Sequence, residues 1–275
     1  MNYPKYSVLM SVYYKERAEY LDIALNSMIQ QTISPDEFIL VEDGPLTKEL
    51  DKVIKKYQEK YPKLFTIIKI ENNGGLGPAL AIGVKASKNE LIARMDSDDY
   101  SIKNRCEKEL NCFMNDPKLQ VVGSFEAEFI NTINNVVSVH KVPEKSKDIK
   151  EFMKRRCALL HPTVMYRKNA VLKVGNYHSV PLYEDYDLFA RMVLGYGMKA
   201  YNLQENLYYI RTSQDFYMRR GGFKYAKTAL QFKANLLKEG YTSLSDFIIS
   251  GVGQALVSIM PNKLRKKFYE KVLRK

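Results

Sequence analysis

The chain has few cysteines and lacks several patterns that define whole classes of protein. Its three cysteines are an odd number at spacings that match no zinc site, which argues against a disulfide framework and favours a reducing compartment. No apolar run reaches the roughly 18 residues that span a bilayer. Residues 1–15 lack the basic-then-apolar order of a signal peptide. We therefore expect a cytoplasmic globular protein.

Positive charge, by contrast, is in excess. The 275 residues are 45% hydrophobic, enough for the core of one large domain or of a domain with an appendage. Lys and Arg (43) exceed Asp and Glu (31) by 12, which points to a polyanionic partner: nucleic acid, an anionic membrane or a phosphorylated substrate. Residues 261–275 hold seven basic residues and one acid, and so half of this excess.

Strand and helix signals alternate through the first half of the chain, which predicts a mostly parallel sheet with helices on both faces. The expected strands are 6–12, 37–41, 64–70, 91–95 and 119–125, and the expected helices are 17–31, 46–61, 78–86 and 102–115. The second half is less regular. Its predicted elements are a β-rich segment at 129–142, helices at 145–156 and 185–194, short strands at 164–166, 200–203 and 207–211, and mostly helix from 216 onward.

Acidic residues follow apolar or strand-like segments at three places: Asp43, the pair Asp96 and Asp98, and the pair Glu184 and Asp185. Parallel strands end along one edge of a sheet, so the first two groups should converge there. Clustered carboxylates suit Mg²⁺ or Mn²⁺ shared with nucleotide phosphates. A solvated acidic turn that caps the next helix is the structural alternative for the Asp96–Asp99 segment.

These motifs, in this order, resemble those of family 2 glycosyltransferases with the GT-A fold, of the bacterial type that builds capsule, exopolysaccharide or O-antigen units. The resemblance covers about residues 5–212. It implies an α/β fold with a mostly parallel nucleotide-binding sheet flanked by helices, a small β-rich acceptor part and a helical C-terminal extension. The segments that carry it are SVLMSVY (7–13), VEDG (41–44), NNGGLG (72–77), ARMDSDD (93–99) and YEDY (183–186).

The resemblance implies a UDP-sugar site along the strand ends. Tyr13 would lie beside the uracil ring, Glu16 would reach the ribose or base, and Asp43 would accept a hydrogen bond from the uracil imide. Gly75, within the glycine-rich segment, would allow close approach of the nucleotide, and Arg94 would contact it. Each residue also has a structural alternative. Tyr13 could be a core aromatic and Glu16 an acid at the start of a helix. Asp43 could form a turn, Gly75 a plain strand-to-helix connection, and Arg94 an ion pair with the nearby acids.

The resemblance also implies the catalytic roles. Asp98 would bind Mn²⁺ or Mg²⁺, with Asp96 toward the ribose or the metal. Asp185 would be the base that deprotonates the acceptor hydroxyl, with Glu184 as the second candidate. Arg219 and Arg220 would close over the diphosphate, or form a solvated basic turn.

The function implied is inverting transfer of one sugar from a UDP-sugar to a lipid-linked saccharide in cell-surface polysaccharide synthesis. Processive members of the family carry a Gln-x-x-Arg-Trp motif, and this chain has no tryptophan. We expect a glycosyltransferase domain at 1–212, with a nucleotide-sugar half at 1–125 and an acceptor half at 126–212, followed by a helical extension at 213–275. In residues 263–275, apolar positions four apart among basic residues predict an amphipathic helix that binds the anionic inner face of the cell membrane or packs on the domain.

Two other functions fit parts of the pattern. A sugar-nucleotide nucleotidyltransferase shares such a sheet and metal, but the segment Ser11–Tyr14 offers no glycine for its phosphate loop. A non-catalytic basic binding protein would explain the net charge. However, no nucleic-acid-binding motif is present and the charge is concentrated at one end, so no nucleic-acid partner is expected.

Overall fold

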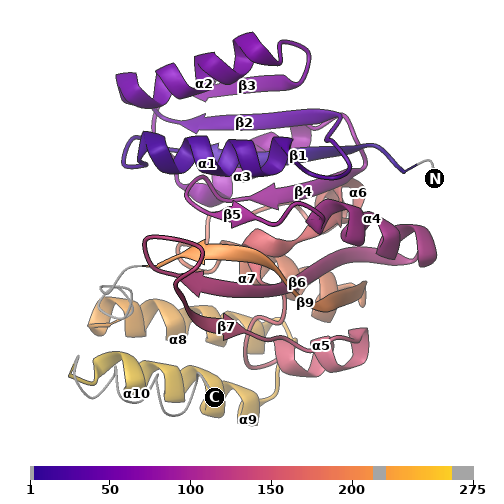
Figure 1. The fold of residues 1–275 in the computed structure, drawn as a ribbon. Coiled ribbons are helices and arrows are strands. Elements are labelled where there is room, and N and C mark those ends of the chain that lie inside the picture. The colour runs from indigo at the N-terminus through magenta and orange to yellow at the C-terminus, as the bar shows by residue number, and fades with distance from the viewer. Residues whose placement is uncertain (1–2, 213–220, 262–275) are drawn as a thin grey trace.

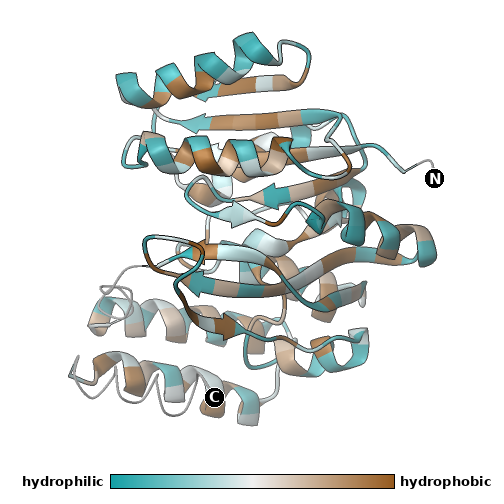
Figure 2. Cartoon of the chain, in the orientation of Figure 1, coloured by the Kyte–Doolittle hydropathy of each residue, from teal (hydrophilic) through white to brown (hydrophobic). Residues whose placement is uncertain are grey.

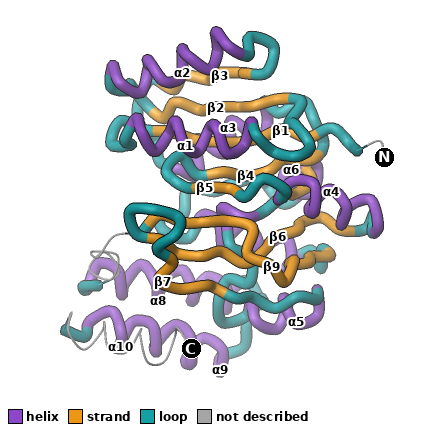
Figure 3. The backbone as a smooth tube through the Cα atoms, in the orientation of Figure 1, coloured by secondary structure: helices purple, strands orange, loops and turns teal. Residues whose placement is uncertain are grey.

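In the described part of the chain, nine strands form one mixed sheet (Figure 1). The computed structural model describes residues 3–212 and 221–261. The strand order is β3-β2-β1-β4-β8-β6-β9-β5, and β7 pairs with β6. The tube view shows the strands as one curved layer with helices on both sides (Figure 3).

The first half of the sheet is parallel, as predicted. β1 (Tyr6–Val12) lies between β2 (Glu37–Asp43) and β4 (Leu91–Met95), and β3 (Phe65–Ile70) forms the edge. All residues of β2 and β4 are buried, as expected for strands covered on both faces. The connecting helices are α1 (Ala18–Ile29), α2 (Lys48–Lys60), α3 (Leu76–Ala86) and α4 (Arg105–Asn115).

The second half of the sheet mixes strand directions. β6 (Leu119–Phe129) pairs in parallel with β9 (Lys199–Arg211), and antiparallel with β7 (Val136–His140) and β8 (Met165–Arg167). β8 also pairs antiparallel with β4 and so joins the two halves. The other elements here are β5 (Tyr100–Ser101), α5 (Ser146–Met153), the 3₁₀ turn η1 (His161–Thr163), α6 (Lys168–Lys173), α7 (Glu184–Ala190) and the π turn η2 (Arg191–Gly195).

Two apolar clusters fill the space on opposite faces of the sheet. One cluster packs α1, α2 and α4 against the alternate β1 residues Val8 and Met10. The other packs α3, α5, α6 and α7 against Leu9 and the neighbouring strands. Side chains alternate between the faces of a strand, so β1 contributes to both clusters. Hydropathy colouring shows the strands largely brown and α2 mostly teal (Figure 2).

A helical extension covers one end of the molecule. It consists of α8 (Phe223–Lys238), α9 (Leu244–Asp246), the π turn η4 (Phe247–Val252) and α10 (Gly253–Ile259). The last three form one continuous helix that lies beside α8 (Figure 1). In the parts of the chain that the structure describes, no helix has the length and apolarity to cross a bilayer.

The structure differs from the sequence-based expectation in two respects. The two short strands expected at 200–203 and 207–211 form the single strand β9, because β6 pairs with it across the intervening residues through register shifts. The two-residue strand β5 and the short helix α6 were not predicted, since elements of this length show little periodicity. The expected tail helix at 263–275 lies outside the described residues.

Candidate active site

The acidic residues predicted to converge do so at the carboxyl edge of the parallel strands. In the sheet register, Val12 of β1 lies beside Glu42 of β2, and Met10 lies beside Met95 of β4. The residues that follow these strand ends, Asp43 among them, therefore share one edge of the sheet.

The Asp43 carboxylate holds the loop that leads from β3 into α3. Its Oδ1 accepts a hydrogen bond from the Gly74 amide at 2.8 Å, and its Oδ2 accepts from the Gly75 amide and from Asn73 Nδ2, both at 3.0 Å. A carboxylate has about four acceptor positions, so one remains at Oδ1. Gly75 takes a φ of +90° at the start of α3, a conformation that favours glycine.

The Arg94 guanidinium lies beneath the acidic turn and pairs with the Asp96 carboxylate through Nη1. Arg94 is 1% exposed. Burial acts to lower the pKa of this guanidinium, but the charge and hydrogen bond of Asp96, together with Tyr208 and Tyr177, raise it above its usual range. Arg94 therefore acts on the open side of the site through Asp96, which is partly exposed.

Negative charge is crowded at this turn. Burial, followed by the charges of Asp96 and Glu16, raises the pKa of Asp98 to about 7. Burial and the charges of Asp98 and Asp96 also raise the pKa of Asp99 well above its usual range. A carboxyl group that resists ionisation for these reasons is stabilised in its charged form by a cation. The residues present therefore fit a divalent metal ion.

Two residues that sequence reasoning left out of the site hold this turn in place. The Tyr208 hydroxyl donates to Asp99 Oδ2 at 3.0 Å, and it accepts a hydrogen bond from the Asp96 amide at 3.2 Å. The Arg211 amide donates to Asp99 Oδ1 at 2.7 Å, and its side chain donates to the Asp98 carbonyl. Both come from β9, more than 100 residues away in sequence, so no local pattern signalled them.

The loop after β1 closes another side of the site. Glu16 Oε2 accepts a hydrogen bond from Ser97 Oγ at 2.8 Å and so joins this loop to the acidic turn. Tyr13 is 41% exposed and Tyr14 is 50% exposed. Their rings meet edge to face with centroids 5.9 Å apart. Tyr13 is therefore an exposed aromatic rather than a core residue.

Glu184 and Asp185 form the first turn of α7, on the sheet face opposite α1. Burial raises the pKa of Asp185 to about 6; the neighbouring Glu184 charge adds to the rise and the Arg94 charge opposes it. Burial likewise raises the pKa of Glu184. The Arg94 charge also acts to lower the pKa of Glu184.

Gly77, near the start of α3, packs closely against the residues that begin α7. A methyl group at Gly77 would lie 2.7 Å from the His178 carbonyl oxygen and 3.3 Å from Glu184 Cβ. The start of α3, which Asp43 anchors through its loop, therefore packs directly against the start of α7. The three acidic segments consequently surround one region of the molecule.

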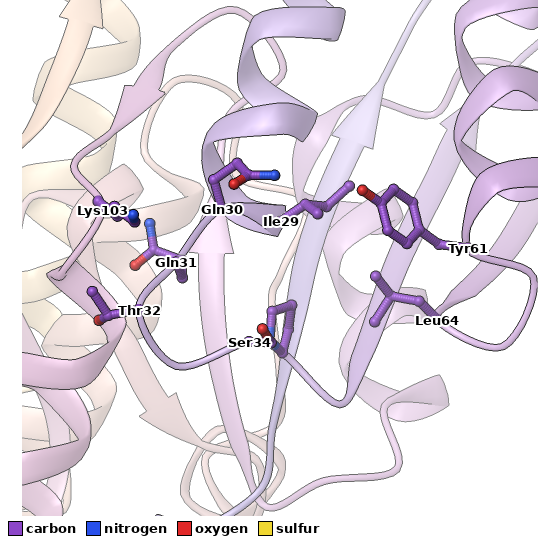
Figure 4. Close-up of a pocket in the computed structure, with 9 residues that line it drawn as sticks. Ile29, Gln30, Gln31, Thr32, Ser34, Tyr61, Leu64 and Lys103 are labelled. Carbon is purple, nitrogen blue, oxygen red and sulfur yellow. The ribbon is translucent and has the colours of Figure 1, made fainter.

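Several other features lie apart from the acidic edge or within the core. His161 is buried and bonded to the Tyr177 hydroxyl at 2.9 Å, and burial lowers its pKa well below the usual range. A hollow of about 610 Å³ lies near the amino ends of β2 and β3 (Figure 4), whereas Asp43 is at the carboxyl end of β2. Its lining is Ile29, Gln30, Gln31, Thr32, Ser34, Pro35, Tyr61, Leu64 and Lys103.

The structure leaves two predicted site features unplaced or incomplete. Arg219 and Arg220 lie outside the described residues. Within 3–212 and 221–261, no three Asp, Glu, His or Cys side chains come together in a way that could hold a metal ion by themselves. This is compatible with a site where phosphate or water oxygens complete the shell, as is common for Mg²⁺.

Comparison with known proteins identifies the family. The model of the family described as "Glycosyl transferase family 2" matches residues 7–175. The chain belongs to this family. The match covers the Asp43 and Asp96–Asp98 segments but ends before Glu184. The protein is therefore a glycosyltransferase, and neither the nucleotidyltransferase nor the nucleic-acid alternative receives support.

Two curated relatives match nearly the full length of this glycosyltransferase. The UDP-Gal:alpha-D-GlcNAc-diphosphoundecaprenol beta-1,3-galactosyltransferase of Escherichia coli is 34% identical over 99% of this chain and 98% of its own. The amylovoran biosynthesis glycosyltransferase AmsE of Erwinia amylovora is 30% identical over 97% and 98%, respectively.

Solved structures confirm the GT-A fold. Staphylococcus aureus TarS 1–349 in complex with UDP-GlcNAc gives a TM-score of 0.64 at 18% identity, covering 98% of this chain and 76% of that one. The mannosyltransferase PcManGT of Pyrobaculum calidifontis, in complex with GDP-Man and Mn²⁺, gives 0.67 at 13% identity, covering 96% and 72%.

Proposed function

We propose that this glycosyltransferase moves one sugar from a UDP-sugar to a lipid-linked saccharide, with inversion at the anomeric carbon. The observation that carries the proposal is the meeting of Asp43, the Asp96–Asp98 turn and Asp185 around one end of the sheet. The full-length E. coli relative supports the substrate classes, since its name specifies UDP-Gal and a diphosphoundecaprenol-linked acceptor.

The nucleotide would lie along the strand ends. The exposed ring of Tyr13 offers a flat surface for uracil. Asp43 has an acceptor position left for the imide N–H, and Gly75 keeps the neighbouring backbone open. Glu16 would contact the ribose or base from the β1–α1 loop, where Ser97 fixes its carboxylate.

Asp98, with Asp96 beside it, would hold Mn²⁺ or Mg²⁺. A bound metal ion of this kind offsets the charge of the diphosphate as UDP leaves. Arg94 would hold Asp96 in position through their ion pair. Arg219 and Arg220 would bind the diphosphate from the other side.

Asp185 would accept the proton of the acceptor hydroxyl. The hydroxyl oxygen forms the new bond to the anomeric carbon while the bond from that carbon to the UDP oxygen breaks, and UDP leaves with the bonding electrons. A pKa of about 6 leaves Asp185 ionised at neutral pH and makes it a stronger base than an ordinary aspartate. Glu184, one position earlier, would orient the acceptor or the base.

The proposed organisation follows the same division of roles. Residues 1–125 would bind the donor, 126–212 would bind the acceptor, and 213–275 would form a helical extension. The basic segment 263–275 would hold the enzyme on the anionic inner face of the cell membrane, where lipid-linked acceptors lie.

A thermal-shift screen with UDP, GDP, dTDP and CMP, each with and without Mn²⁺, tests the donor proposal. A ligand at 100 times its Kd stabilises a folded protein by about 2.7 kcal/mol. We expect the largest shift with UDP and Mn²⁺, and its loss in Asp98→Ala. A larger shift with another nucleotide would overturn the UDP assignment, and no shift with any nucleotide would contradict the donor site itself.

A further inference from the structure

The helix formed by α9, η4 and α10 leaves a row of large apolar side chains open to solvent. We call this row the outer face. It runs along residues 244–259, which span about 24 Å at 1.5 Å per residue, and Figure 2 shows brown segments along this helix. The outer face consists of Leu244 (62% exposed), Ile248 (52%), Ile249 (56%), Val252 (36%), Leu256 (54%) and Ile259 (43%).

The opposite side of this helix packs on the rest of the protein and contains the helix's charged residue. Asp246 is the one charged residue among positions 244–259. Its carboxylate is largely buried and accepts a hydrogen bond from Arg155 Nε at 2.7 Å. Ala255 and Ser258 are buried against the rest of the extension. The outer face therefore carries no charge, and its exposure does not result from a poorly packed helix.

Exposed basic and aromatic side chains lie at the end of the outer face. The Gly222 amide donates to the Ser258 carbonyl at 2.9 Å, which places the start of α8 beside the end of α10. Phe223, the first residue of α8, is 83% exposed, and Lys224 and Lys227 are exposed as well. In sequence, the strongly basic residues 262–275 follow directly. Apolar surface bordered by cations suits an anionic lipid surface.

The same helix contacts the candidate catalytic helix. Gln254 Nε2 donates to the Tyr183 hydroxyl at 3.0 Å, and Tyr183 is the N-cap residue directly before α7. The Tyr183 ring also stacks on Phe232 of α8, with centroids 4.4 Å apart. The outer face is thus separated from the start of α7, where Asp185 lies, by about the thickness of one helix.

We propose that the outer face docks on an anionic lipid bilayer, with the helix of residues 244–259 lying in the plane of the membrane interface. The membrane contact then belongs to the folded extension itself, in addition to the basic segment that follows it. Where the acceptor is lipid-linked, which rests on the proposed function, this orientation brings its lipid to the side of the enzyme where Asp185 lies.

Tryptophan fluorescence tests this directly, because the chain has no tryptophan of its own. Leu256→Trp places a single indole on the outer face, and Ile23→Trp places one at a 41% exposed apolar position on α1. Both full-length proteins are mixed with vesicles of phosphatidylcholine and phosphatidylglycerol. We expect a blue shift of the emission for Leu256→Trp and none for Ile23→Trp, since tryptophan buries in the interface.

Three outcomes would overturn the proposal. An unshifted Leu256→Trp spectrum while the protein floats with the vesicles would place the membrane contact elsewhere. Emission that is already blue without vesicles, at every protein concentration, would show that the chain covers its own outer face. A blue shift without vesicles that grows with protein concentration would assign the face to a second copy of the chain.

Vesicle flotation of a charged variant gives a second readout. Ile249→Glu with Leu256→Glu should bind the anionic vesicles at least about tenfold more weakly than the wild type, because apolar burial drives interfacial binding. Ile23→Glu with Ile82→Glu is the matched control at two comparably exposed isoleucines, and its binding should be unchanged. Equal flotation of both double variants would contradict the proposal.

The UDP-dependent thermal shift, measured on the same variants, separates this inference from the proposed function. The outer face belongs to the helical extension and not to the strand ends proposed to bind the nucleotide, so the shift should persist in Ile249→Glu with Leu256→Glu. Loss of flotation with the shift retained supports membrane docking. Failure of UDP binding in the wild type would contradict the donor assignment, but it would not change the conclusion drawn from flotation about membrane docking.

Discussion

Asp98 carries an electrostatic cost that its neighbours relieve only in part. Burial, Asp96 and Glu16 disfavour its charged form, and the Arg94 guanidinium, which pairs with Asp96, opposes them only partly. Tyr208 and the Arg211 amide donate hydrogen bonds to both carboxylate oxygens of Asp99, although burial disfavours its charged form as well. The acids of this short turn therefore differ in their hydrogen-bond partners. A carboxylate whose charged form is disfavoured is typical of functional sites, where residues needed for activity often lower the stability of the folded protein.

Removal of this charge should stabilise the protein and inactivate it. We expect Asp98→Asn to raise the free energy of unfolding by about 1 kcal/mol in the metal-free protein, because the carboxylate repulsion disappears. Transfer activity should fall about a thousandfold, since several kcal/mol of charge stabilisation are lost. Chemical denaturation and a transfer assay measure the two effects. Asp51→Asn, on the exposed side of α2, is the control and should change neither. A destabilised, active Asp98→Asn would contradict the assignment.

Asp98 also makes stability depend on pH. Its pKa in the folded protein, about 7, lies above the usual value for aspartate, so the folded state binds the proton more tightly than the unfolded state. Stability of the metal-free protein should therefore fall as pH rises from about 4 to 7 on account of this group. The comparison of wild type with Asp98→Asn across this range isolates the effect, which should be absent in the variant. If the stabilities of the two proteins changed with pH in the same way, Asp98 would not be the group responsible.

Asp185 should govern the acidic side of the pH–rate profile. With metal at saturating concentration, kcat/KM is expected to rise with pH through about 6, where the Asp185 carboxyl loses its proton. In Asp185→Asn the rate should fall about 10²–10⁴-fold and lose this dependence. A rate that does not change between about pH 5 and 8 would be incompatible with Asp185 as the base.

At the scale of elements, the start of α3 is in close contact with the start of α7, and we expect the site to depend on this contact. The sequence was sufficient for the parallel strands: β1 and β4 were predicted with the bounds observed, because their apolar runs end at clear turns. The convergence of Asp43 with Asp96 followed from parallel topology alone. The position of α7 did not follow from the topology, because it depends on packing between segments about 100 residues apart.

The long strand β9 illustrates the same limit. Polar residues in its middle divided the sequence signal into two short strands, and only the pairing with β6 joins them. Its last residues supply Tyr208 and Arg211 to the acidic turn. These contacts were not predictable from the sequence, since neither residue lies near the acids in the chain and each resembles an ordinary strand residue. The ion pair of Arg94 with Asp96 had been expected as one of two alternatives.

Gly77→Ala tests the contact between α3 and α7. The new methyl group would meet the His178 carbonyl at 2.7 Å, so the backbone must shift, at a cost of about 1–3 kcal/mol in stability. The shift would also displace Glu184 and Asp185, and kcat should fall. Thermal unfolding and steady-state kinetics report the two effects.

The matched control is Gly253→Ala, also in a helix, where a methyl group meets nothing within 4 Å. This substitution should stabilise the protein by about 0.4–1 kcal/mol through the unfolded state. If Gly77→Ala also stabilises the enzyme and leaves kcat unchanged, the close contact plays no part in placing the base.

At the scale of the whole molecule, the extension and the catalytic domain share one apolar core. Ala229, Phe232 and Leu236 of α8 belong to the same cluster as Leu9 of the central sheet. Buried Lys233 donates to the Arg155 carbonyl and to the Tyr186 hydroxyl. The extension therefore packs against α7 and helps to hold it in place.

We expect unfolding in a single transition, with the extension contributing to it. Phe232→Ala removes a buried ring that stacks on Tyr183, and should lower stability by about 3–5 kcal/mol. Phe223→Ala, at an 83% exposed position of the same helix, should leave stability nearly unchanged. Circular dichroism during urea unfolding measures both. Two separate transitions in the wild type would show that the extension is an independent unit.

The most direct measurement is mass spectrometry of the reaction product, with a synthetic diphospholipid-linked saccharide as acceptor and a panel of UDP-sugars with Mn²⁺. The wild type should add one sugar residue from one UDP-sugar and release UDP. Asp185→Asn should keep the UDP-dependent thermal shift and form almost no product. Consumption of no UDP-sugar by the wild type, or full activity of Asp185→Asn, would contradict a UDP-sugar transferase with its base at the start of α7.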